Sequence, residues 1–102
     1  MTWVPAVNKA EVIPGTAVVF VADGKRIAVC NTGEGFYAID DVCTHDGGAL
    51  DQGHLDGIEI ECPRHGARFD VTTGKALCLP AVRPVKTYPA RVAGDTIEVE
   101  VP

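Results

Sequence analysis

Cys43-Thr44-His45 and Cys62-Pro63-Arg64-His65 are the two stretches that decide what this chain folds around. Each combines one thiol with one imidazole, and sixteen residues separate them. A mononuclear zinc finger usually groups its cysteines on one element and its histidines on another. Here two facing loops would instead give two cysteines to one metal and two histidines to a second. The spacing therefore predicts a metal site formed by Cys43, His45, Cys62 and His65.

Such a division of ligands is typical of a Rieske 2Fe-2S cluster, in which two histidines replace two cysteines on one of the irons. The stretches CTHDGG (43–48) and CPRHGARFD (62–70) resemble the two cluster loops of the Rieske ferredoxins, and LPAVRP (79–84) is similar to their proline-bearing third loop. The likeness covers nearly the whole chain. It implies one 2Fe-2S cluster, with Cys43 and Cys62 on the inner iron and His45 and His65 on the outer iron. Structural zinc held by the same four residues is the alternative.

Short apolar runs separated by turn residues predict a succession of strands. Asp23-Gly24 marks a two-residue hairpin turn, and no segment has a helical period longer than a turn or two. We therefore expect an all-β fold over residues 1–102, a single antiparallel Rieske-type domain of sandwich or small-barrel architecture. Two cluster-binding loops and the proline loop should lie together at one end. The predicted strands are residues 16–22, 25–30, 36–39, 58–61 and 96–101.

The charge distribution bears on the partners. The chain carries a net charge of −5, and residues 34–61 hold eight of its fourteen carboxylates without any Lys or Arg. This acidity argues against nucleic acid or an anionic membrane as a partner. The acidic segment either steers a basic partner protein or only aids solubility. No uncharged stretch is long enough to span a membrane and residues 1–9 lack the order of a secretory signal, so we expect a soluble, cytoplasmic monomer.

The family resemblance implies an electron carrier between a flavoprotein reductase and a terminal oxygenase of the ring-hydroxylating type. The chain is not expected to be the oxygenase, because oxygen activation needs two further histidines and a carboxylate on another iron. Only His54 remains after the four ligands, and its sequence context predicts a solvated loop residue. Similar small Rieske proteins also serve iron-sulfur assembly or nitrite reduction. An electron carrier for one of these systems is the alternative function.

The resemblance also indicates a low reduction potential. High-potential Rieske proteins carry an additional disulfide-bonded cysteine on each loop, where this chain has Gly48 and Arg64. They also place serine and tyrosine hydroxyls near the cluster sulfurs, where this chain has Ala67 and Phe69. Fewer hydrogen bonds to sulfur leave the reduced state less stabilised, so we expect a potential below zero.

Four other features carry expectations. Cys30 and Cys78 are predicted to be small buried apolar residues, with a disulfide between them as the alternative. Arg64 is expected to meet a partner protein or to pair with an acid such as Asp46, and Arg68 to form a structural salt bridge.

Residues 80–84, which begin and end with proline, are predicted to form a stiff cover over the cluster. In that cover the apolar Ala81 and Val82 would exclude water from the site.

Overall fold

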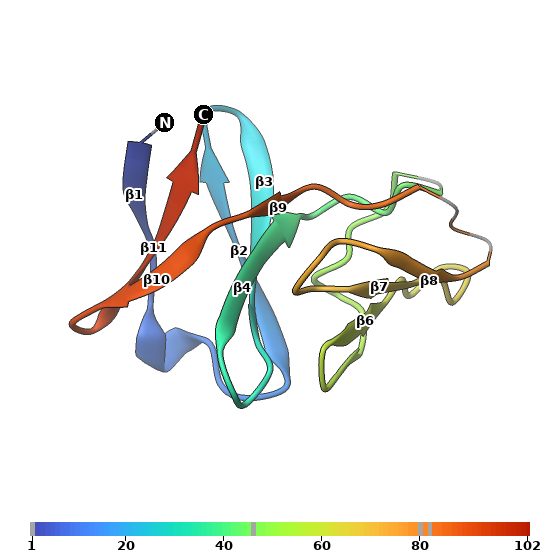
Figure 1. Cartoon of the computed structure of the whole chain (residues 1–102), viewed down its shortest axis with the longest axis horizontal. Coiled ribbons are helices and arrows are strands. Elements are labelled where there is room, and N and C mark those ends of the chain that lie inside the picture. Colours follow the sequence, from blue (N-terminus) through green and yellow to red (C-terminus); the bar gives the residue numbers. More distant parts are fainter. Residues whose placement is uncertain (1, 46, 80, 82) are drawn as a thin grey trace.

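The computed structural model describes residues 2–45, 47–79, 81 and 83–102, which form three antiparallel sheets (Figure 1). Sheet A has the order β1 (Thr2–Asn8), β11 (Thr96–Val101), β10 (Ala90–Ala93). Sheet B has the order β2 (Thr16–Ala22), β3 (Lys25–Asn31), β4 (Phe36–Asp40), β9 (Thr87–Tyr88). Sheet C has the order β5 (Leu55–Asp56), β6 (Glu59–Glu61), β7 (Arg68–Asp70), β8 (Ala76–Cys78). A short 3-10 helix, Lys9–Glu11, follows β1.

The central strand β3 explains how the sheets are stacked. Its last five residues are all buried, because successive side chains point to opposite faces and both faces of sheet B are covered. Ile27 and Val29 belong to one core with Ile97 and Val99 of sheet A. Ala28 and Cys30 belong to a second core, which includes residues of sheet C. Sheet B is therefore the middle layer, with sheet A on the left and sheet C on the right in Figure 1.

The second core positions the predicted site. It contains Leu50, Leu55 and Phe69 from the part of the chain that carries sheet C, and both Cys43 and Cys62 lie in it. The two cysteines that were predicted to bind metal are thus packed among apolar side chains that join sheets B and C.

The all-β antiparallel prediction is confirmed, and the stacked sheets correspond to a sandwich, not to a closed barrel. The predicted strands 16–22 and 96–101 agree with β2 and β11 residue by residue. The strand predicted over 58–61 begins one residue later, at Glu59, because Gly57 takes a φ of 60° and Ile58 belongs to the turn with 45% of its surface exposed. Within the described residues, no helix is long and apolar enough to cross a membrane.

At Gly53 the backbone after the first predicted loop closely approaches the backbone before the second. A Cβ atom at Gly53 would overlap the carbonyl oxygen of Glu61, the residue that precedes Cys62. The neighbouring backbone is also joined there, since the Glu61 amide donates to the His54 carbonyl at 2.9 Å. The two loops are therefore held at a separation that only glycine permits.

We predict that Gly53→Ala lowers the free energy of unfolding by about 2–3 kcal/mol, because backbone atoms must move to admit the methyl group. Gly57→Ala is the control, since a Cβ there meets no atom within 4 Å and only the φ of +60° is strained. It should cost about 1 kcal/mol. Urea denaturation measures both, and a Gly53→Ala variant no less stable than Gly57→Ala would contradict the close approach.

Candidate metal centre

The first loop leaves β4 and turns tightly around Cys43. The Cys43 amide donates to the Gly48 carbonyl at 2.7 Å, and the Gly47 amide donates back to the Cys43 carbonyl at 2.8 Å. Gly47 has a φ of 78°, a conformation that glycine adopts without steric cost. The amide and the carbonyl of Cys43 are therefore both hydrogen-bonded within the loop. This closed turn fixes the direction of the Cys43 side chain.

The second loop repeats this turn at the same offsets. The Cys62 amide donates to the Ala67 carbonyl at 2.7 Å, and the Gly66 amide donates to the Cys62 carbonyl at 3.1 Å. Gly66 has a φ of 76°, within a few degrees of the value at the matching glycine of the first loop. Two segments distant in sequence therefore present a cysteine in the same local conformation.

The two residue types of the site lie at different depths. Cys43 and Cys62 are each 1% exposed, whereas His45 and His65 are exposed. The two imidazole rings meet edge to face, with centroids 5.3 Å apart and planes at 85°. The structure thus places one pair of thiols inside and one pair of imidazoles outside, on the same two loops. Among the described residues, no group of three or more Cys, His, Asp or Glu side chains is placed to hold a metal ion.

The segment that follows sheet C is tied to the first loop. The Thr44 hydroxyl, between Cys43 and His45, donates to the Arg83 carbonyl at 2.7 Å. Ala81 and Val85 are buried in the same core as the two cysteines. The predicted water-excluding role of Ala81 agrees with this burial, while Pro80 and Val82 of the predicted cover lie outside the described residues. Sequence reasoning had no signal for Thr44, because a lone hydroxyl between two ligands matches many loops.

Comparison with known families decides the assignment. The family model described as the Rieske [2Fe-2S] domain matches residues 2–89. The chain belongs to this family. Its cofactor is accordingly one Rieske 2Fe-2S cluster, and the inner thiols and outer imidazoles supply the donor types that such a cluster requires. The zinc alternative is set aside.

Individual relatives agree with the family assignment. The chain is 37% identical over 99 residues to the naphthalene 1,2-dioxygenase system ferredoxin component of Pseudomonas putida, covering 97% of this chain and 95% of that protein. The solved ferredoxin of carbazole 1,9a-dioxygenase from Nocardioides aromaticivorans superposes with a TM-score of 0.91 at 39% identity, covering 97% of each chain. A chain in the complex of reduced oxygenase and oxidized ferredoxin in carbazole 1,9a-dioxygenase gives a TM-score of 0.89 at 35% identity, covering 95% of this chain and 91% of that chain.

The surroundings of the Rieske site are apolar on the inner side. Ala67 and Phe69 are both 0% exposed, and neither has a hydroxyl that can donate to a cluster sulfur. Arg68, between them, points outward and forms ion pairs with Glu61 at 2.8 Å and Glu59 at 3.6 Å. The predicted structural salt bridge of Arg68 is therefore confirmed.

Two further predictions concern single residues near the site. His54 is exposed in the loop before β5, so its prediction as a solvated loop residue is confirmed. Arg64 is exposed beside His65, which suits contact with a partner protein. Its predicted pairing with Asp46 lies outside the described residues.

The two remaining cysteines differ from each other. Cys30 is 0% exposed, as predicted, and burial, together with the nearby Asp41 carboxylate, raises the pKa of its thiol to about 12. Cys78 is exposed, so the prediction that it is buried was wrong. It ends the edge strand β8, and its thiol contacts the Gly66 carbonyl of the second loop at 3.6 Å. Both cysteines are free, so the alternative of a disulfide between them is also wrong.

This difference predicts selective alkylation of the folded protein. At pH 8, iodoacetamide should label Cys78 and leave Cys30 unlabelled, because Cys30 is buried and its thiolate is scarce at that pH. Peptide mass spectrometry after quenching measures the label. Cys78→Ser should remove it, and denaturation should expose Cys30. Labelling of Cys30 in the folded protein would contradict the placement of that side chain.

Proposed function

We propose that this chain is a low-potential Rieske ferredoxin that carries single electrons from a flavoprotein reductase to a terminal non-haem iron oxygenase of a ring-hydroxylating dioxygenase system. The observation that carries the proposal is the exposed imidazole pair His45 and His65 above the buried thiols Cys43 and Cys62. An electron bound at such a site leaves through the imidazole side, where a partner protein can approach. The relatives named as ferredoxin components of dioxygenase systems support the same reading.

The ligand assignment is part of this proposal. Cys43 and Cys62 would hold the inner iron, and His45 and His65 would hold the outer iron. When bound, the cluster supplies reversible one-electron chemistry. The chain's own contribution is to exclude water from the inner side with the second core and to leave the outer side open.

The chain itself does not activate oxygen. A non-haem iron oxygenase site needs two histidines and a carboxylate besides the Rieske ligands, and the sequence contains three histidines in total. With His45 and His65 on the cluster, only His54 remains. The protein is therefore an electron-transfer component and not an enzyme, and the oxygenase is a separate protein.

Carboxylates of the acidic segment 34–61 also support the fold. Five of its seven described carboxylates make hydrogen bonds or ion pairs within the chain. Asp40 accepts a hydrogen bond from the Tyr88 hydroxyl, and Glu59 and Glu61 form ion pairs with Arg68. Asp41 and Asp51 both lie within ion-pair distance of Arg26.

We also propose that residues 1–102 act as one domain, since β3 belongs to both cores. We propose a monomer in the cytoplasm, where a reducing compartment keeps Cys30 and Cys78 as thiols.

The function is tested by electron transfer between purified proteins. Anaerobic mixing of the oxidised ferredoxin with a flavoprotein reductase and NADH should reduce it, and a ring-hydroxylating oxygenase with its substrate and oxygen should reoxidise it and form hydroxylated product. Cys62→Ser, which removes one proposed ligand, should reduce product formation to the level without ferredoxin. Reduction by the reductase without reoxidation by any oxygenase of the class would contradict the proposed client.

The reduction potential should lie below zero and near the lower end of the Rieske range, at about −150 mV. Buried Ala67 and Phe69 donate no hydroxyl hydrogen bond to the cluster, so the added electron is less stabilised than in proteins with serine and tyrosine there. Phe69→Tyr should raise the potential, and Phe36→Tyr on β4 is a control that should not. A midpoint above about +100 mV for the natural chain would contradict the assignment.

A further inference from the structure

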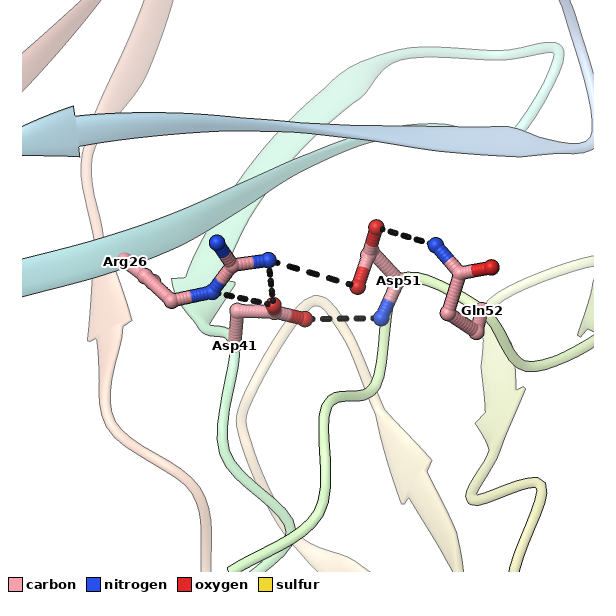
Figure 2. A network of polar contacts seen from close by, with 4 residues as sticks. All are labelled: Arg26, Asp41, Asp51 and Gln52. Carbon is pink, nitrogen blue, oxygen red and sulfur yellow. Dashed lines mark hydrogen bonds and ion pairs between the residues drawn. The ribbon is translucent and has the colours of Figure 1, made fainter.

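A buried carboxylate lies at the base of the first cluster loop. The side chain of Asp41 is 0% exposed and is directed at two partners from different parts of the chain (Figure 2). Its Oδ2 accepts from Nη2 of Arg26 at 3.1 Å and from Nε at 3.3 Å. Its Oδ1 accepts from the backbone amide of Asp51 at 2.7 Å. The Asp41 side chain thus links Arg26 of β3 to the backbone at Asp51, and both Asp41 and Asp51 belong to the loop.

These two points are the beginning and the end of the loop. Asp41 directly follows β4 and stands two residues before Cys43, while Asp51 directly follows the buried Leu50. The hydrogen bond between Asp41 and Asp51 therefore joins the two ends of the segment that carries Cys43 and His45. The Asp41 amide also donates to the Arg26 carbonyl at 3.0 Å, so backbone and side chain hold the same two residues together.

The contact is maintained against an energetic cost. The Asp41 side chain has no exposed surface, and a buried carboxylate is costly unless it is paired and hydrogen-bonded. Arg26 supplies the positive charge from a position where its own side chain is 55% exposed. Arg26 therefore covers a buried charge from the solvent side. A buried ion pair often adds little net stability. Because this pair lies at the base of the loop, it points to a role in positioning the loop.

Asp51 completes the arrangement. Its Oδ1 lies 3.9 Å from Nη2 of Arg26 and is buried without a hydrogen bond in the described structure. Its Oδ2 accepts from the Gln52 side-chain amide at 2.9 Å. A single guanidinium thus faces carboxylates from both ends of the loop (Figure 2).

We propose that Arg26 is a positioning residue for the cluster: acting through Asp41, it holds the first loop closed so that Cys43 and His45 keep their place opposite the second loop. The inference rests on the proposed assignment of Cys43 and His45 as ligands. Arg26 lies far from both cluster loops in sequence, and no ligand motif includes it.

The test is a double-mutant cycle on the holoprotein. Arg26→Met and Asp41→Ala should each speed hydrogen exchange at the Asp51 amide about tenfold or more. Asp41→Ala removes the carboxylate that accepts from this amide, and Arg26→Met removes the partner that holds the carboxylate in place. The same variants should lose the cluster faster to a chelator, followed by visible absorbance, and should broaden the electron paramagnetic resonance spectrum of the reduced form. The double variant should lose less than the sum of the two single variants, because Arg26 acts mainly through Asp41.

Arg91→Met is the matched control. Arg91 is 52% exposed and pairs with Glu98 at 2.8 Å on sheet A, so it resembles Arg26 in exposure and charge but lies away from the cluster loops. It should leave exchange at Asp51 and the reduced spectrum unchanged. Arg26→Lys keeps the charge without the two-nitrogen contact and should fall between the natural chain and Arg26→Met, which keeps the test open if the latter folds poorly.

Three outcomes would overturn the proposal: unchanged exchange and cluster retention in Arg26→Met, equal effects in Arg91→Met, or additive losses in the double variant. Absence of a cluster from the natural chain would contradict the proposed function instead. In that case exchange at Asp51 still reports whether Arg26 closes the loop, so the two failures remain distinguishable.

Discussion

The site depends on one repeated backbone turn, in which the amide and the carbonyl of a cysteine are both hydrogen-bonded within its own loop. The turn at Cys43 and the turn at Cys62 use the same offsets and the same left-handed glycine. Because the backbone polar groups are satisfied locally, each cysteine can be buried in an apolar core without an unpaired amide. The histidines, two or three residues further along, are carried outward by the same turn. The difference in depth between thiols and imidazoles follows from this geometry.

The rest of the fold holds the two turns opposite each other. The middle sheet B supports the second core, and the backbone contact between Gly53 and Glu61 sets the distance between the segments that carry the loops. Asp41 joins the first loop to β3 through Arg26, and Thr44 joins it to the segment at Arg83. A cluster site of this kind needs fixed loops, because small displacements of ligands change both metal affinity and potential.

The candidate ligands can be named from sequence because their chemistry is concentrated in short, unusual spacings, and their assignment stays a prediction. Strand β11 was predictable because TIEVEV alternates apolar and polar residues, and β2 because TAVVFVA is rich in β-branched residues and precedes the Asp23-Gly24 turn. Strands of two or three residues, such as β5 and β9, are too short to show any period. Cys78 was misplaced because residue type favours burial, whereas its position at the end of an edge strand leaves it exposed. The pairing of Arg26 with Asp41 depends on tertiary contacts between distant segments, which a single sequence does not reveal.

The structure also changes the meaning of the acidic composition. Most of the described carboxylates between residues 34 and 61 hold loops and strands together, so the acidic composition serves the fold as well as the surface charge. Arg64 is exposed beside the imidazole pair.

The central claim is that two thiols bind one iron inside and two imidazoles bind the other iron outside. Pulsed electron paramagnetic resonance of the dithionite-reduced protein, prepared with ¹⁵N-histidine, tests this most directly. The account predicts strong couplings to two histidine nitrogens, of which one is lost in His45→Cys and the other in His65→Cys. A reduced cluster without histidine nitrogen coupling, or a coupling that survives both substitutions, would contradict it.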